Sequence, residues 1–186
     1  MNETLKNILN RRSVRAFLPQ QIKEEELQEI IRAGLYAPSS HNHQSWHLAV
    51  VQDQQLLHEL SEDAKEAAKH FDDPLIQQLA NNKTFQAFYE APTVIIVSGE
   101  KEAMLPVTDC AAATQNMLIA AQSLGIGSCW VGFVSFALRG EKGKEYGKRL
   151  ALPEGYKPYH AVALGYKKIE NVQAPARRAN TVSYIR

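Results

Sequence analysis

The sequence predicts a single α+β or three-layer α/β domain that spans residues 1–186. The chain is long enough to bury one core, and 45% of its residues are hydrophobic while 22% are charged. Segments with helical periodicity alternate with short β-branched runs along its length. No repeat, low-complexity stretch or linker divides it. One domain is therefore expected.

The N-terminal quarter predicts two helices. A short helix is expected over residues 4–9, with Thr4 as its cap, and it leads into a basic run over residues 11–15. A longer helix covers residues 24–36, where acidic side chains crowd the first turn and complement the helix dipole. Its apolar positions recur at helical spacing: Leu27, Ile30, Ile31 and Leu35.

The middle of the chain alternates between loop, strand and helix. Residues 38–46 are polar without periodicity and predict a loop, and residues 47–52 read as a strand. Two amphipathic helices over residues 54–70 and 75–89 are separated by a proline turn. The continuous β-branched run over residues 93–97 predicts a central strand buried on both faces.

The C-terminal half completes the pattern. An alanine-rich helix over residues 108–124 is apolar on most of its surface and should be buried, in part at a subunit interface. A glycine-punctuated strand and turn follow over residues 125–132, and a charged surface helix covers residues 140–150. Further strands are expected over residues 159–165 and, in the tail, 182–185.

Charge and cysteine content exclude several function classes. Lys plus Arg number 21 against 20 for Asp plus Glu, so the net charge of +1 predicts neither a nucleic acid nor a membrane partner. No apolar signal segment opens the chain, and its most apolar run is too short to span a bilayer. Cys110 and Cys129 stand far apart without a disulfide or zinc pattern. We expect a cytoplasmic protein.

Two basic clusters are candidate anion sites. Three arginines and a serine fall within residues 11–15, and an arginine pair stands at residues 177–178. Guanidinium groups bind phosphoryl oxygens bidentately, and a hydroxyl adds a further donor. The alternative is a set of solvated surface arginines. Gly127 and Gly132 would let a flat ring approach the main chain closely, unless they are ordinary turn glycines.

Other chemistry finds little support. His41, His43 and His47 are spaced like metal ligands, but no Asp or Glu lies between Ile31 and Gln52 to activate a water. A metal-dependent enzyme stays an alternative that this histidine cluster alone supports. Nucleophilic catalysis is not indicated, because no GxSxG elbow is present and neither cysteine adjoins a basic motif.

Four segments together resemble the flavin-dependent nitroreductase family. They are RRSVRAF at residues 11–17, APSSHNHQSWH at 37–47, LGIGSCWVG at 124–132 and the arginine pair near the C-terminus. The resemblance covers nearly the whole chain. It implies an α/β/α sandwich with a mixed, mainly antiparallel sheet flanked by helices, and a homodimer with two FMN sites at the interface.

The resemblance also implies roles for residues of these segments. Arg11 and Ser13 would hold the FMN phosphate and ribityl chain, with Arg12 beside them. Arg15 would place a cation near flavin N1 and O2, where the reduced ring carries negative charge. Arg177 or Arg178 would close on the phosphate.

Two further segments would contact the flavin ring. The loop that reaches FMN from the opposite subunit is matched by Pro38, Ser39, Ser40, Asn42 and Gln44. The segment whose backbone faces the ring and donates towards N5 is matched by Trp130, Val131 and Gly132. The chain departs from the family at Ser45, where longer members carry proline, and in the pair Cys129-Trp130. Another flavin ligand is expected within residues 54–90, at no identified position.

The implied activity is hydride transfer from NADH or NADPH, by a ping-pong mechanism, to a nitroaromatic, quinone or related acceptor. FMN carries the chemistry, so no side-chain acid or base is required. A flavoenzyme of the same fold with another reductive or dehydrogenating substrate, and an FMN-storing binding protein, are the alternatives.

Overall fold

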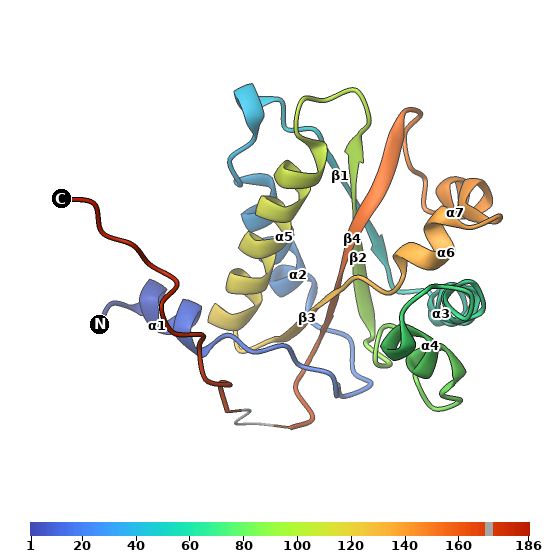
Figure 1. The fold of residues 1–186 in the computed structure, drawn as a ribbon, viewed down its shortest axis with the longest axis horizontal. Helices are drawn as coiled ribbons and strands as arrows, with labels where there is room; N and C mark the ends of the chain where they lie inside the picture. Colours follow the sequence, from blue (N-terminus) through green and yellow to red (C-terminus); the bar gives the residue numbers. More distant parts are fainter. Residues whose placement is uncertain (170–172) are drawn as a thin grey trace.

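The computed structural model describes residues 1–169 and 173–186. Helices cover both faces of a four-stranded sheet whose strand order is β1-β2-β4-β3 (Figure 1). The strands are β1 (Trp46–Val51), β2 (Thr93–Glu100), β3 (Gly127–Val131) and β4 (Tyr156–Gly165). All pairs of neighbouring strands are antiparallel, and the parallel pairing found in the described residues is an isolated bridge between Ser13 and Ser128. The predicted α+β class is confirmed.

The helices divide between the two faces of the sheet. One layer holds α2 (Glu24–Leu35) and α5 (Pro106–Ser123), and the other holds α3 (Gln54–Ala68), α6 (Ser135–Arg139) and α7 (Gly143–Arg149). The remaining helical segments are α1 (Glu3–Asn10), the 3-10 turn η1 (Ser40–Asn42) and α4 (Pro74–Asn81). Each layer packs on its own hydrophobic cluster, so the sheet is buried from both sides.

The β2 strand lies inside the sheet, as its β-branched run predicts. It pairs with β1 on one side and β4 on the other. Val94 and Ile96 point into the α3–α6–α7 cluster, whereas Ile95 and Val97 point into the α2–α5 cluster, and all four are fully buried. Burying each such side chain contributes about 1.5–3 kcal/mol. Because successive side chains of a strand point to opposite faces of the sheet, β2 contributes side chains to both cores.

The α2 and α5 helices approach each other closely through a glycine. A Cβ atom on Gly34 would lie 2.8 Å from the Cγ of Met117, so any larger residue would push the helices apart. On α5 the inward side is formed by small and apolar residues, among them Ala113 and Ala121. The sequence predicts that this helix is buried, and most of its positions are buried or half-buried.

The helix boundaries differ from the expectations in three places. Asn2 caps α1 by accepting a hydrogen bond from the Leu5 amide at 2.9 Å, so the prediction of Thr4 as cap is wrong. The α4 helix ends at Asn81 instead of residue 89, because the Asn82 side chain takes the Thr84 amide and hydroxyl into a turn. The short α6 helix precedes the predicted surface helix and was not expected from the sequence.

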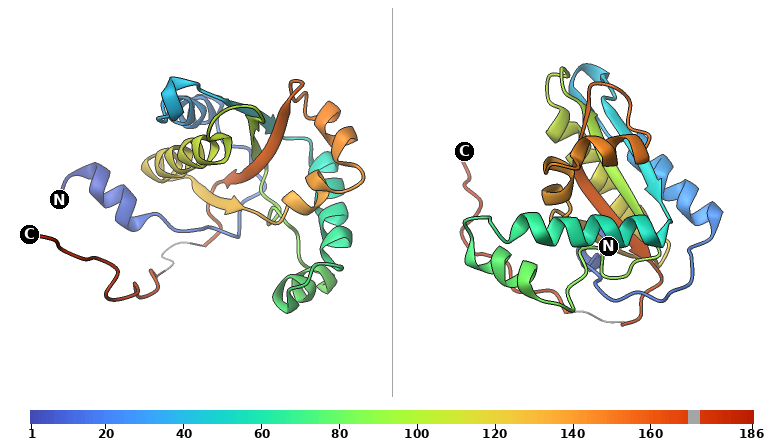
Figure 2. Two further views of the ribbon diagram at one scale, coloured as in Figure 1. Left: turned by 45° about the horizontal axis from the view of Figure 1, so that its top comes forward. Right: turned by 90° about the vertical axis from the view of Figure 1, so that its right-hand side faces the viewer.

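The two ends of the chain lie on the same side of the molecule, away from the sheet (Figure 2). No residue of α1 is buried, and every residue from 173 to 186 is exposed. The strand predicted over residues 182–185 is absent from this tail, which is irregular where the structure describes it. Its apolar side chains therefore have no cover within the described chain.

Candidate functional site

The basic run is held along the edge of the sheet beside β3. Ser13 forms the bridge to Ser128, and the Val14 amide donates to the Ser128 carbonyl at 2.9 Å. Val14 and Phe17 are buried in the cluster that includes Cys129 of β3. The arginines of the run are less buried than these two side chains, since Arg11 and Arg12 are half-buried and Arg15 is exposed.

Positive charge accumulates at this edge without a matching carboxylate. Burial, together with the neighbouring charges of Arg12 and Arg177, lowers the pKa of Arg11. Burial raises the pKa of the Cys129 thiol, although Arg15 and Arg11 act against it. Among the residues that the structure describes, no arginine of the run forms an ion pair. The geometry therefore favours binding of an anion.

The arginines of the run differ in their surroundings. The Nη1 of Arg12 donates to the carbonyls of Leu9 at 2.8 Å and Arg11 at 2.7 Å, while its buried Nε has no partner in the described structure. Arg12 thus closes the end of α1 and keeps one free donor. The Arg15 guanidinium lies 5.7 Å from the centre of the Tyr89 ring, and its interaction with the Tyr89 side chain raises the pKa of Arg15.

The terminal arginines lie in the exposed tail. Arg177 is near enough to Arg11 for its charge to lower the pKa of that guanidinium. No such influence of Arg178 on the basic run is found in the described structure. Of the pair, Arg177 is therefore the residue that the structure brings to the cation cluster.

The end of β3 leaves open space beside the main chain. A Cβ atom on Gly132 would meet nothing within 4 Å, so the backbone there is accessible to a ligand. Val131 is buried towards α3 and α6, and the half-buried Trp130 ring packs edge-on against His160 at 4.8 Å. Gly127 differs, because a Cβ there would lie 3.0 Å from both Lys167 and Val14. Gly127 packs against other parts of the protein, so the expectation that a flat ring approaches the main chain at Gly127 is wrong.

A pocket with a volume of about 360 Å³ opens beside Arg15. The segment after α4 supplies its other walls, including Asn82, Phe85 and Tyr89. Tyr89 and Glu90 both adopt a left-handed backbone with φ of 57°, which turns the chain sharply towards β2. Sequence reasoning expected a contribution from residues 54–90 but named no position. The signal was the polar Asn-Asn-Lys-Thr stretch where helical periodicity stops.

The serine loop, residues 38–45, forms a rigid structure at the other end of α5. His41, Asn42 and Gln44 have φ of 49°, 56° and 49°, and each left-handed residue costs on the order of 1 kcal/mol. The Gln44 amide donates to the Ser39 hydroxyl at 2.9 Å, and its side chain donates to Asn42 at 3.2 Å. These hydrogen bonds within the loop stabilise its strained backbone.

The loop and the basic run do not meet within one chain. The Ser40 hydroxyl contacts Met104 just before α5, whereas Ser13 is paired with Ser128 just after the far end of α5. A helix of 18 residues is about 27 Å long, too far for one small ligand to bridge. Figure 1 shows the two segments at opposite ends of the molecule.

The three candidate metal ligands do not converge. The His41 and His43 rings are 6.0 Å apart and exposed, and His47 packs against Tyr156 with ring centres 6.1 Å apart. Within residues 1–169 and 173–186, no group of three or more His, Cys, Asp or Glu side chains is placed to hold a metal. None of the helices in those ranges combines the length and apolar character needed to cross a membrane.

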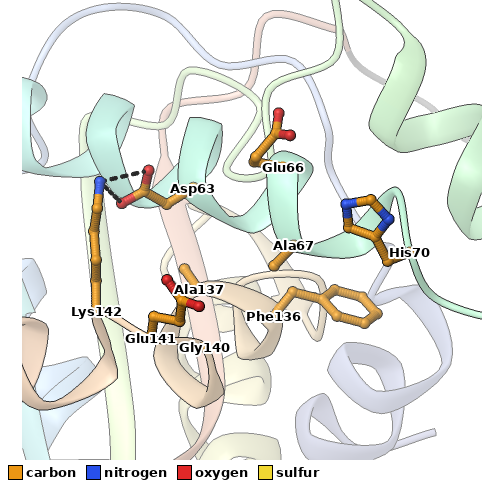
Figure 3. Close-up of a pocket in the computed structure, with 9 residues that line it drawn as sticks. All are labelled: Asp63, Glu66, Ala67, His70, Phe136, Ala137, Gly140, Glu141 and Lys142. Carbon is orange, nitrogen blue, oxygen red and sulfur yellow. Dashed lines mark hydrogen bonds and ion pairs between the residues drawn. The ribbon is translucent and has the colours of Figure 1, made fainter.

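Another pocket, between α3 and the segment joining α6 to α7, is lined by acidic residues (Figure 3). Its Asp63 carboxylate pairs with Lys142 at 2.9 Å and accepts from the Tyr146 hydroxyl at 2.6 Å. Glu66 pairs with Lys69 on the same helix. These carboxylates serve contacts within the protein, and the pocket contains none of the predicted site residues.

The fold and the site define an α+β protein with a cluster of arginines along one edge of the sheet and an unobstructed backbone after β3. The chain belongs to the nitroreductase family, whose model matches residues 8–166. It is 36% identical over 174 residues to an Archaeoglobus fulgidus protein with the provisional name NADH dehydrogenase/NAD(P)H nitroreductase, covering 91% of this chain and 88% of that one.

Two solved structures share the whole fold. A nitroreductase with bound FMN from Bacteroides fragilis is 37% identical, with a TM-score of 0.91 and complete coverage of both chains. A nitroreductase with bound FMN from Desulfitobacterium hafniense is 31% identical, again with a TM-score of 0.91 and complete coverage. The predicted family resemblance is thereby confirmed.

Proposed function

We propose that residues 1–186 act as one FMN-binding domain of an NAD(P)H-dependent oxidoreductase. When bound, FMN would take a hydride from NADH or NADPH and pass it, in a ping-pong mechanism, to a nitroaromatic, quinone or related acceptor. The proposal is carried by the arginine cluster, which has no carboxylate partner among the residues that the structure describes, together with the open backbone of Gly132 just after β3. The FMN found in both similar nitroreductase structures supports the same ligand.

The residues present fit the phosphate end of this cofactor. Arg11, Ser13 and the tail residue Arg177 would supply donors and positive charge, and the free Nε of Arg12 offers one further donor. Hydrogen bonds between guanidinium groups and a phosphate are charge-assisted and bidentate. Arg178 stays a candidate by sequence alone. An anion at this point would relieve the repulsion that now lowers the pKa of Arg11.

The ring end would lie between Arg15 and the end of β3. Arg15 is held by Tyr89 and would favour the negatively charged, reduced ring. The Gly132 backbone would face the ring at van der Waals distance, since no side chain blocks it. Trp130 and Val131 fix the strand that presents this backbone. The pocket by Asn82 and Tyr89 is then the space where nicotinamide and acceptor bind in turn.

We further propose that the protein is a homodimer in which the serine loop of one subunit completes the FMN site of the other. The separation of the loop from the basic run within one chain supports this arrangement. Uncovered apolar side chains at both ends of the chain support it as well: Leu5, Ile8, Leu9, Val182, Tyr184 and Ile185. In this arrangement Pro38, Ser39, Ser40, Asn42 and Gln44 contact the FMN of the partner.

A cytoplasmic location is proposed with it. Cys110 and Cys129 are both free and buried, as is usual for proteins that stay in a reducing compartment.

Initial-rate kinetics test the proposed reaction. With NADH or NADPH varied at several fixed concentrations of a quinone, and then of a nitroaromatic, we expect parallel double-reciprocal lines. Intersecting lines would contradict the ping-pong mechanism. Bound FMN without acceptor reduction would favour an FMN-storing protein, and turnover confined to other acceptors would favour a flavoenzyme with a different substrate.

A further inference from the structure

We infer that Asp109 is a positioning residue that holds the serine loop in the shape needed to complete the FMN site. Asp109 belongs to none of the segments that resemble the family's flavin contacts. The inference rests on the proposed function, because it concerns the loop that we assign to the FMN of the partner subunit.

The Asp109 carboxylate accepts hydrogen bonds from both halves of the serine loop. One oxygen accepts a hydrogen bond from the Ser40 amide at 2.9 Å, and the other accepts from the Ser45 hydroxyl at 3.0 Å. Asp109 is only 3% exposed and Ser45 only 1%. Both bonds join positions more than 60 residues apart in the chain, so they fasten the loop to α5.

The charge of Asp109 has no cation to balance it. Within the described part of the chain, no Lys, Arg or His side chain pairs with it. Its support comes from the two loop donors and from the positive end of the α5 dipole, since it lies in the first turn. A buried carboxylate is costly unless its donors are well placed. It therefore favours the one loop conformation that presents these donors.

The loop depends on this anchoring because the backbone at its tip is strained. Three residues without a glycine's freedom, His41, Asn42 and Gln44, are left-handed. The bonds between Gln44 and its neighbours Ser39 and Asn42 lie inside the loop and are exposed. They can move with the loop as a unit. The Asp109 carboxylate is anchored in the helix layer, so it fixes the position of Asn42 and Gln44 relative to the sheet.

The first test compares matched variants for FMN affinity and thermal unfolding. Asp109→Ala removes both hydrogen bonds, and we expect the FMN dissociation constant to rise about 10- to 100-fold. Thr114→Ala is the control, because Thr114 is equally buried on the same helix and donates only to the Cys110 carbonyl. It should lower the unfolding temperature without changing FMN affinity. Equal affinities in the two variants would overturn the inference.

Two further variants separate positioning from folding. Asp109→Asn keeps an acceptor for the Ser40 amide and can donate to the Ser45 oxygen, so it should restore most of the affinity. If Asp109→Asn binds FMN no more tightly than Asp109→Ala does, the role assigned to these two hydrogen bonds is contradicted. If Asp109→Ala does not fold, Ser45→Ala decides, since it removes one bond only. Unchanged FMN affinity in Ser45→Ala would then overturn the inference.

Mixed dimers test whether the loop serves the partner. In a dimer of one Arg11→Ala subunit and one Asp109→Ala subunit, both defects fall in the same site, so the other site should bind FMN normally. Half of the wild-type FMN content, at wild-type affinity, is the expected result. Loss of both sites would overturn the inference.

The same set of proteins separates this inference from the proposed function. Wild-type protein that takes up no FMN would end the proposed function itself. Wild-type protein that binds FMN, with Asp109→Ala binding it equally well, would end only the inference. Should Arg11→Ala retain FMN, the phosphate assignment fails, and the affinity comparison still decides on Asp109.

Discussion

Burial lowers the pKa of Arg11, and repulsion from the Arg12 and Arg177 guanidinium groups lowers it further. A bound phosphate would reverse the sign of this interaction, because each arginine then has an anionic partner. The affinity of the site for FMN should therefore depend strongly on this one side chain.

Arg11→Ala tests this dependence. We expect FMN binding to weaken by about 1–3 kcal/mol, the range for hydrogen bonds to charged groups. Riboflavin, which lacks the phosphate, should bind both proteins equally, and fluorescence titration measures both ligands. Equal losses for FMN and riboflavin would place Arg11 away from the phosphate.

Arg15 should affect reduction of the flavin more than its binding. Arg15→Ala removes the cation that we place near N1 and O2, so reduction by NADH or NADPH should slow about 100-fold while FMN stays bound. Stopped-flow absorbance of the loaded protein measures the rate. Arg15→Lys keeps a positive charge and should recover part of it. An unchanged rate in Arg15→Ala would remove this residue from the ring site.

From the sequence, candidate site residues could be proposed where a short motif carries the chemistry. The arginine run shows its charge directly in the sequence, and the structure collects Arg11 and Arg177 as one cluster. Asp109 was not identified, because a single Asp in an alanine-rich helix has no local signal. Its function depends on Ser40 and Ser45, which only the tertiary fold brings near.

At the scale of elements, a partly exposed group of polar contacts joins α3 to the start and the interior of α7. The Asp63 carboxylate accepts from the Tyr146 hydroxyl at 2.6 Å and pairs with Lys142 at 2.9 Å. Burial acts to raise the pKa of Asp63, but these two donors outweigh it and hold the pKa below its ordinary value of 3.8. Ionised Asp63 therefore stabilises the folded chain above that value.

Tyr146→Phe should lower the free energy of unfolding by about 1–2 kcal/mol at neutral pH. The lowered pKa of Asp63 means that its contribution is lost as the pH falls through the folded value, so the deficit should shrink in acid. Urea denaturation at neutral pH and at a pH below the folded pKa of Asp63 measures this deficit in the free energy of unfolding. Tyr36→Phe, at the exposed C-terminal end of α2, is the control and should have no effect. A deficit that does not change with pH would contradict this account.

Elements with strong periodicity were predicted closely. The β2 and α3 segments differ from expectation by only a few residues at their ends. The agreement follows because a buried β-branched run indicates a strand and a long amphipathic pattern indicates a helix. The α4 boundary failed because the Asn82 turn competes locally with the helix. The α6 helix spans only five residues, too few for periodicity to show.

At the scale of the whole molecule, we propose that the two ends of the chain take part in the dimer interface. Leu9 is 56% exposed on a helix that buries nothing in its own chain. Exposed apolar surface of this kind marks an interface. The proposed dimer would cover it and at the same time bring each serine loop to the basic run of the other chain.

Leu9→Glu should dissociate the dimer and release FMN together, because both sites need two chains. Sedimentation should then give the mass of the single 20.8 kDa chain, against twice that mass for the wild type. Lys6→Gln, on the same helix, changes the charge of α1 but places no charge among its apolar side chains. This control variant should stay dimeric. A monomeric wild type that binds FMN fully would contradict the shared site.

Long-range arrangement was the least predictable feature from sequence. Periodicity locates helices and strands but not which loop meets which strand end, so the approach of Tyr89 to Arg15 and the distance of the serine loop from the basic run appear only in the fold.

An anaerobic absorbance titration of the purified protein is the decisive test of FMN-dependent oxidation of NADH or NADPH. We expect flavin absorption bands that bleach on addition of NADH or NADPH and return with a quinone or nitroaromatic, with FMN released on denaturation. A colourless protein that takes up no added FMN, or bound FMN that neither nicotinamide reduces, would contradict it.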